Sequence, residues 1–196
     1  MSQRNRGSSL VELLTAFAII GLIVLVTMPA FGNMRRRSAL RAASAQLRSI
    51  FHLTRSRAIS AGVNCGMKFS QIGGVWQFAV YLDGDGDGIR NDDITKKVDR
   101  LLEPPRVVFP ESRAVDIGLL PISIKDPDGD PLPPSKSPVA FNRSTICSFS
   151  PLGESTPGSI YITDRGRDLW CVRVYGATAK VRVLRYDRDK KKWVTS

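Results

Sequence analysis

The sequence predicts an α+β protein, in which one long N-terminal helix precedes a domain of antiparallel strands. Residues 8–62 keep apolar side chains at helical spacings. Residues 63–196 instead contain short segments of alternating apolar and polar side chains, separated by turns rich in glycine and proline. The chain has 196 residues, of which 42% are apolar, which is enough for one globular domain and an appendage.

The first part of the helix carries almost no charge. No charged residue lies between Leu13 and Met34, a length that would carry a helix across a bilayer. Apolar side chains surround this helix, as burial in lipid requires. Residues 28–30 are a poor version of a signal-peptidase site, so the segment is expected to stay in the mature protein. The sequence therefore predicts a transmembrane helix with one acid, Glu12, at its edge.

The N-terminus also contains a specific motif. A short basic leader ends in Gly7, the run Ser8-Ser9-Leu10-Val11-Glu12 opens the apolar helix, and Pro29 lies downstream. This arrangement resembles the class III signal of type IV pilins and type II secretion pseudopilins. The resemblance implies that prepilin peptidase cleaves between Gly7 and Ser8 and that the new N-terminus, Ser8, is methylated. Ser8 departs from the family, which usually has phenylalanine there.

The same resemblance gives Glu12 a role in assembly. Cleavage makes Glu12 the fifth mature residue and Pro29 the twenty-second, and both offsets match the family. In that family, the N-terminal ammonium of one subunit meets the glutamate of its neighbour and fixes the axial register of a fibre. Such a contact is heterologous and does not close, which is the geometry of helical filaments.

The resemblance divides the chain into four parts. Residues 1–7 form the leader, 8–34 the transmembrane and assembly helix, 35–62 the amphipathic half of the helix, and 63–196 a β-rich periplasmic domain. The implied fold class is a pilin-like α+β fold, whose long helix packs on an antiparallel β-sheet with its first half in the membrane. The implied location is the inner membrane, crossed once, with the C-terminal domain in the periplasm and later in the fibre.

The second half of the helix is expected to lie on the domain. Its apolar side chains share one face, at spacings of three, four and seven: Leu40, Ala43, Leu47, Ile50, Phe51, Ala58 and Ala61. Arg41, Arg48 and Arg55 recur every seven residues on another face, which is either solvated or opposed to acids of neighbouring subunits. The only histidine, His52, is interpreted as a surface or packing residue.

The order of elements resembles the GspH/FimT branch of pseudopilins and minor pilins. Three stretches carry this resemblance: an Ala- and Arg-rich helix, an aromatic strand that enters an Asp-rich loop, and the C-terminal strands. In this sequence they are "LRAASAQLRSIFHLTRSRAISAGV", "WQFAVYLDGDGDGIRNDD" and "GSIYITDRGRDLWCVRVYGATAKVRV".

The Asp-rich loop begins like an EF-hand, with acids at alternating positions and glycines between them. Ile94 stands where that motif has a bidentate glutamate, so the full motif fails. A structural Ca²⁺ is one hypothesis, and an acidic hairpin loop without a cation is the other. The candidate ligands are Asp83, Asp85, Asp87, Asn91 and Asp93.

The C-terminal region is basic, in a chain whose formal net charge is +11. Basic side chains among aromatic ones can bind a phosphate backbone without reading its sequence. Some FimT-like minor pilins capture DNA through a Gly-Arg-x-Arg motif. The nearest stretches here contain Arg165 and Arg167, and Lys180 and Arg182. A solvated or subunit-facing surface is the alternative.

The sequence contains few of the motifs that are typical of enzyme active sites. The sequence has no nucleophile elbow and no Gly-rich phosphate loop, and its single histidine cannot complete a triad. Cys65, Cys147 and Cys171 form no CxxC pair, and the sequence leaves any disulfide pairing open.

The expected function is that of a minor pseudopilin or pilin, in a type II secretion pseudopilus or a type IV pilus. The protein would contribute to protein secretion or pilus biogenesis, without catalysis. Its expected partners are other pilins, the assembly platform in the inner membrane and prepilin peptidase. The alternative is a FimT-like minor pilin that binds DNA for uptake in natural transformation.

Overall fold

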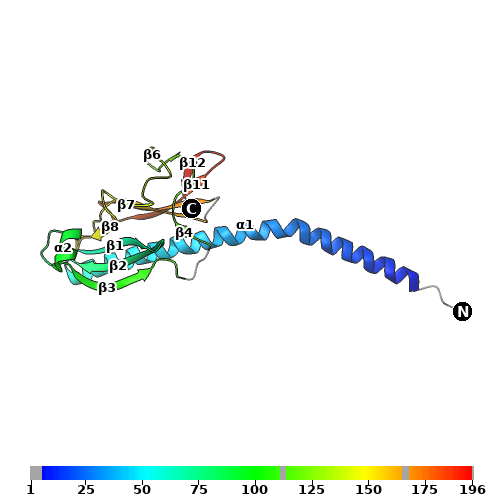
Figure 1. Cartoon of the computed structure of the whole chain (residues 1–196), viewed down its shortest axis with the longest axis horizontal. Helices are drawn as coiled ribbons and strands as arrows, with labels where there is room; N and C mark the ends of the chain where they lie inside the picture. Colours follow the sequence, from blue (N-terminus) through cyan, green and yellow to red (C-terminus); the bar gives the residue numbers. More distant parts are fainter. Residues whose placement is uncertain (1–5, 111–113, 165–167, 196) are drawn as a thin grey trace. The chain divides into compact units, whose positions relative to one another are not determined.

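A computed structural model describes the backbone of residues 6–110, 114–164 and 168–195, and their side chains except at 6–9 and 26–33. Helix α1, Arg6–Ala61, is the first element (Figure 1). The chain divides into two compact units, Met1–Ser38 and Ala39–Ser196. The second unit therefore begins inside the segment 35–62 that was expected to lie on the domain.

The unit Ala39–Ser196 is built mostly of antiparallel β-strands. A first sheet has the order β3 (Arg100–Val107), β2 (Val75–Leu82), β1 (Cys65–Ile72) and β8 (Ile146–Phe149). A second sheet has the order β12 (Lys192–Thr195), β11 (Val181–Asp187), β10 (Leu169–Val174), β9 (Gly158–Thr163) and β4 (Asp116–Ile117), and β7 (Val139–Phe141) also pairs with β9. A ribbon of β5 (Ile124–Lys125) and β6 (Pro131–Leu132) and a short helix, α2 (Asn91–Lys96), complete the unit.

The C-terminal part of α1 forms the centre of the core. Leu40, Leu47 and Phe51 are almost completely buried, in the same cluster as side chains of both large sheets. The Phe51 ring lies between 6.0 and 6.4 Å from the rings of Phe69, Phe141 and Phe149. This aromatic cluster joins the helix to β1, β7 and β8, and so fixes the helix against both sheets.

The central strands of the second sheet, β9 and β10, are buried on both faces. Ile160 and Trp170 point into the cluster that contains the helix. Tyr161 and Cys171, their neighbours in sequence, point into a second cluster that includes Leu132 of the β5–β6 ribbon. Because both faces are covered, β9 and β10 are almost continuously buried rather than alternating between buried and exposed residues.

Two local features fix the first sheet. Gly73 and Gly74 have φ values of 58° and 80°, and they close a two-residue hairpin between β1 and β2. Paired positive φ values match the twist of the flanking strands, which favours glycine at both places. Pro104 and Pro105 lie in β3, which is the edge strand, and the β2–β3 register shifts beside them.

The expected fold class is wrong as stated. No helix among the described residues is long and apolar enough to cross a membrane. This finding contradicts the prediction of a transmembrane first half of the helix. It also contradicts the single-pass inner-membrane location and the periplasmic domain, which depended on that prediction. Among the side chains that the structure describes, the uncharged stretch runs from Leu13 to Leu25, which is shorter than the roughly 20 residues that a helix needs to cross a bilayer. The strands also form two large sheets and a ribbon, where one antiparallel sheet was expected.

The aromatic cluster generates the first prediction. We expect Phe51→Ala to lower the free energy of unfolding by about 3–5 kcal/mol, because it removes a fully buried ring from the centre of the core. Urea unfolding of the full chain, followed by tryptophan fluorescence, measures this loss. The neighbouring variant His52→Ala is the control, because His52 is exposed and its loss should change the free energy by no more than about 0.5 kcal/mol.

Candidate functional site

The N-terminal candidate residues lie on α1. Glu12 is exposed, and it is the only charged residue between positions 10 and 25. Its backbone carbonyl accepts a hydrogen bond from Thr15 Oγ1 at 2.8 Å. The backbone of Gly7 and Ser8 lies in the first turns of the helix, and Pro29 lies within it. The side chains of Ser8 and Pro29 lie outside the described residues.

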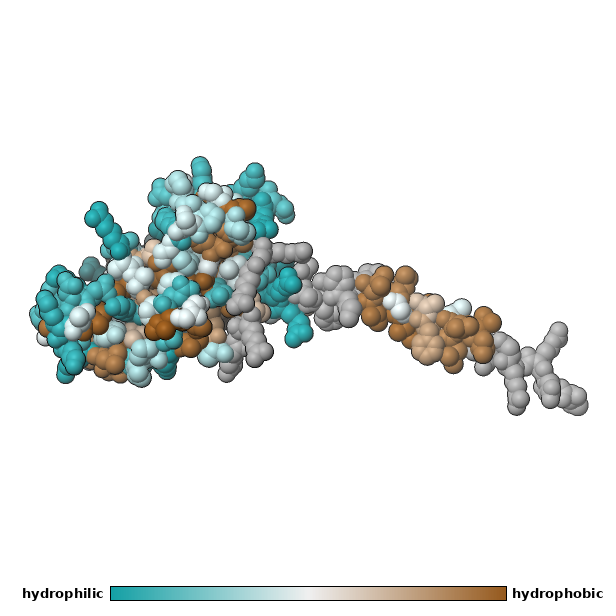
Figure 2. Space-filling model, in the orientation of Figure 1, coloured by the Kyte–Doolittle hydropathy of each residue, from teal (hydrophilic) through white to brown (hydrophobic). Residues whose placement is uncertain are grey.

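The helix around Glu12 exposes a large apolar surface. Eleven large apolar side chains between positions 10 and 25 are exposed, from 49% at Val24 to 75% at Leu25. Figure 2 shows this stretch as mostly brown, the colour of hydrophobic residues. Apolar surface that is contiguous on this scale marks a site of interaction rather than an ordinary solvated surface.

A second candidate site is the acidic loop that follows β2. Asp83 is buried and organises this loop, because each of its carboxylate oxygens accepts two hydrogen bonds. Oδ1 accepts from the backbone N–H groups of Asp85 (3.1 Å) and Gly86 (2.8 Å). Oδ2 accepts from Asn64 Nδ2 (2.6 Å) and from the N–H of Gly88 (2.8 Å). Burial raises the pKa of Asp83, but these hydrogen bonds outweigh it and hold the pKa below its ordinary value.

The glycines of this loop are required by its geometry. Gly86 and Gly88 have φ values of 90° and 95°, which residues with a Cβ rarely adopt. At Gly84 a Cβ would lie 2.1 Å from the carbonyl oxygen of Val98. The Asp-Gly repeat therefore wraps the backbone around Asp83.

A buried acid that the sequence analysis did not single out supports the same loop. Asp99 is 2% exposed and accepts hydrogen bonds from the N–H groups of Gly84 (3.4 Å) and Arg90 (3.0 Å). Burial raises the pKa of Asp99, and the charges of Asp83 and Asp93 raise it further, against these hydrogen bonds. The separation of Asp99 from the Asp-Gly repeat hid its role, and no sequence signal would have found it.

The structure brings together three of the five predicted calcium ligands. Carboxylate oxygens of Asp83, Asp85 and Asp87 lie within 4.8 Å of one another, and among the described residues Asp93 does not join this group. Asn91 and Asp93 instead lie in α2. Because all four lone pairs of Asp83 already accept hydrogen bonds, a cation would have to replace at least one donor. Calcium binding therefore stays a hypothesis.

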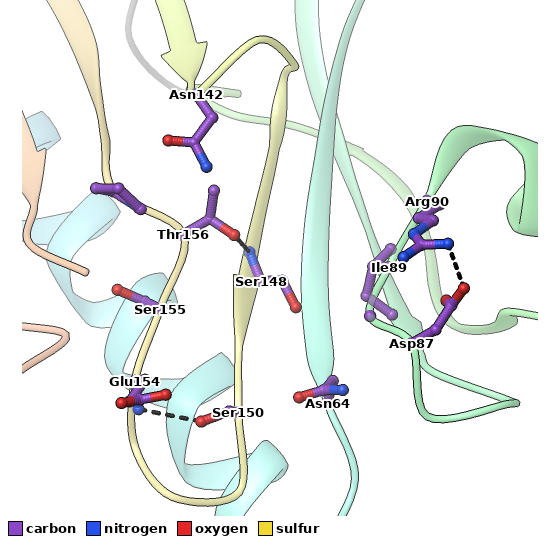
Figure 3. A pocket seen from close by; sticks show the side chains of 12 residues that line it. Asn64, Asp87, Ile89, Arg90, Asn142, Ser148, Ser150, Glu154, Ser155 and Thr156 are labelled. Carbon is purple, nitrogen blue, oxygen red and sulfur yellow. Dashed lines mark hydrogen bonds and ion pairs between the residues drawn. The ribbon is translucent and has the colours of Figure 1, made fainter. Parts of the chain in front are cut away.

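A polar groove of about 410 Å³ lies beside the acidic loop (Figure 3). Asp87 and Arg90, which form an ion pair, lie on one side, and the segment from Ser148 to Thr156 lies on the other. Ser150 Oγ accepts a hydrogen bond from the N–H of Glu154 at 3.2 Å. The groove offers amide, hydroxyl and charged groups, but its lining contains neither histidine nor cysteine. It therefore provides hydrogen bonds to a ligand rather than an activated nucleophile.

The basic candidates are only partly described. Arg165 and Arg167 lie outside the described residues. Lys180 and Arg182 are exposed, and Arg182 lies directly opposite Arg173 across β10 and β11. Both guanidinium groups lie 5.6 Å from the ring centre of Tyr175. Sequence analysis missed Arg173, because only the strand register places it beside Arg182.

The three cysteines are free and buried. Burial raises the pKa of Cys65 to about 11 and that of Cys171 to about 12, and it also raises the pKa of Cys147. Reactive thiols are exposed and have a lowered pKa, so these cysteines behave as packing residues.

Comparisons with known proteins identify no relative of this chain. No family model matches the chain, and no match was found among the curated proteins or the solved structures.

The hydrogen bonds on Asp83 predict a specific pH dependence. The folded pKa of Asp83 is lowered, so its charge stabilises the fold above its unfolded pKa, and this stability is lost as the pH falls through the folded pKa. We expect Asp83→Asn to be less stable than the wild type at neutral pH and to lose less stability in acid. Urea unfolding between about pH 7 and pH 2 measures the difference. The exposed variant Asp92→Asn is the control and should follow the wild-type curve.

The calcium hypothesis makes a separate prediction. Millimolar calcium chloride should raise the Tm above its value in EDTA, because a cation relieves the repulsion among Asp83, Asp85 and Asp87. The double variant Asp85→Asn with Asp87→Asn should abolish that rise. Equal Tm values in calcium and EDTA would contradict the hypothesis.

Proposed function

We propose that this chain is a minor pilin-like subunit of a helical fibre, either a type II secretion pseudopilus or a type IV pilus. In this role it contributes to protein secretion or pilus biogenesis, and it performs no catalysis. One observation carries the proposal: α1 exposes apolar side chains along residues 10–25 around a single acid, Glu12. The fifth place of Glu12 after Gly7 supports the same proposal, because that offset resembles the pilin signal.

The proposed mechanism follows from the free-energy cost of exposing the apolar side chains of residues 10–25 to water. Packing the segment against the same segment of neighbouring subunits removes its apolar surface from water. A carboxylate enters such surroundings only when it is paired with a cation. Cleavage after Gly7 creates an ammonium group at Ser8, and the ammonium of one subunit pairs with Glu12 of the next. Each subunit therefore presents both partners, and the contact repeats along a fibre.

The partners follow from the same mechanism. Prepilin peptidase removes residues 1–7 and methylates Ser8, and an assembly platform adds the processed subunit to the fibre. Other pilins or pseudopilins are the neighbours in that fibre. Pro29, at the twenty-second mature position, belongs to the assembly helix.

Processing is the first step that can be tested. We expect co-expression with a prepilin peptidase to give a mature chain that begins at methylated Ser8, as read by mass spectrometry of the intact protein. Gly7→Leu should retain residues 1–7, because the residue before the cleaved bond is changed. Gly21→Leu is the matched control, since nothing lies within 4 Å of the added Cβ, and it should be processed like the wild type. A wild-type chain that keeps its leader in the presence of active peptidase would contradict the proposal.

DNA binding is a second candidate function, favoured by the pair of arginines on Tyr175. Arg173 already forms an ion pair with Asp128, whereas Lys180 and Arg182 are exposed and provide the positive charge that a phosphate backbone would contact. We expect the chain to shift DNA in a gel at low salt, with an affinity that falls steeply as salt rises. Lys180→Ala with Arg182→Ala should abolish the shift, whereas Lys96→Ala with Lys97→Ala, at the end of α2, should not. If the Lys180→Ala, Arg182→Ala variant shifts DNA like the wild type, this surface is not the DNA-binding site.

A further inference from the structure

An apolar groove runs between α1 and the first sheet, in the unit Ala39–Ser196. Its volume is about 670 Å³, and its lining comes from α1, β2, β3 and the segment after β3: Gln46, Ser49, Ile50, Leu53, Phe78, Arg106, Val107 and Pro110. Leu53 is 50% exposed and Val107 is 38% exposed, although both line the groove. The groove therefore presents apolar side chains to whatever enters it.

The helical wall of the groove has the spacing of a helix-binding face. Positions 46, 49, 50 and 53 lie at i, i+3, i+4 and i+7, so their side chains form one row along α1. An apolar helix that docks in a groove uses the same spacing for its own contacts. Ser49 is small and exposed, which allows a second helix to approach closely at the middle of this row.

The opposite wall is held in place by polar contacts. Gln46 Nε2 donates a hydrogen bond to the carbonyl of Val108 at 2.9 Å, which ties the helix to the segment that follows β3. Arg106 forms an ion pair with Glu103, and its guanidinium lies 5.6 Å from the ring centre of Phe78. Glu103 also pairs with Arg57 of α1. The walls are therefore fixed by their own contacts, and a partner would enter a preformed groove.

We infer that this groove binds residues 10–25 of a second copy of the chain. That segment is helical, and eleven of its large apolar side chains are exposed. Its one charge is acidic, at Glu12. The groove is lined by Arg106, and because Arg106 and Arg57 share a single acid, Glu103, this cluster keeps one net positive charge. No like charges oppose the contact. The choice of occupant rests on the proposed function, in which apolar helices of neighbouring subunits pack together.

Cysteine cross-linking tests the contact directly. Full-length chains that carry Ser49→Cys are mixed with chains that carry Ile20→Cys, assembled and oxidised. We expect a disulfide-linked heterodimer, against a low background because the three native cysteines are buried. Leu152→Cys replaces Ser49→Cys in the control, because Leu152 is 90% exposed and does not line the groove. Equal cross-linking of the control would overturn the inference.

A charge placed in the groove provides a second test. Leu53→Glu should lower the fraction of chain in assemblies at least about tenfold, because it puts a carboxylate where an apolar helix must dock. Leu152→Glu is the matched control, because Leu152 is 90% exposed outside the groove, and it should assemble like the wild type. The Tm of both variants should equal that of the wild type, which excludes unfolding as the cause.

The outcomes separate this inference from the proposed function. If fibres form normally with Leu53→Glu, or if they form without a cross-link between Ser49→Cys and Ile20→Cys, the groove does not bind residues 10–25. Either result would leave the pilin-like function intact. If no fibre forms but the cross-link joins two copies in solution, the groove is supported and the fibre is not. A cross-link from Ser49→Cys to a different protein alone would overturn the choice of occupant.

Discussion

Residues 10–25 expose a large apolar surface, and the cost of leaving that surface in water favours association of the chain. Fully burying one large apolar side chain contributes roughly 1.5–3 kcal/mol, and eleven such side chains are exposed in this segment. Even partial burial would therefore yield on the order of 10 kcal/mol or more, which is comparable with the roughly 4–15 kcal/mol that association costs. Burial of this segment therefore offsets much of the cost of association, and in the proposed fibre the single acid within it, Glu12, would align the copies.

The two parts of α1 bury their side chains in different ways. Residues 39–61 contribute Leu40, Leu47 and Phe51 to the core of their own unit, so this part of the helix is stable without a partner. Residues 10–25 have no comparable cover. The acidic loop is an independent feature, because Asp83 and Asp99 hold it through backbone N–H groups. Its order therefore requires no contact with another chain.

Parts of this structure could be predicted from local patterns, because local patterns determine helices and hairpins. The spacing in the second half of α1 predicted a buried face, and this is confirmed at Leu47 and Phe51 but not at Ala61, which is exposed beside the end of the helix. Strands β8 and β12 have only four residues each, which is too short for alternation to reveal, and β8 pairs with the distant β1. Two further features also depend on contacts between distant residues. Strand pairing places Arg173 opposite Arg182, and the fold brings Asp99 to the acidic loop. The transmembrane prediction was wrong, because no helix among the described residues is long and apolar enough to cross a membrane.

In the proposed fibre Glu12 aligns the apolar helices of neighbouring copies, and the amount of Glu12→Ala in fibres tests this role. The variant is expressed with prepilin peptidase and wild-type partners, and the chain is quantified in isolated fibres and in the unassembled pool. We predict normal cleavage after Gly7, an unchanged Tm and a fraction in fibres at least about tenfold below that of the wild type. Processed, stable Glu12→Ala that enters fibres at the wild-type level would contradict the account.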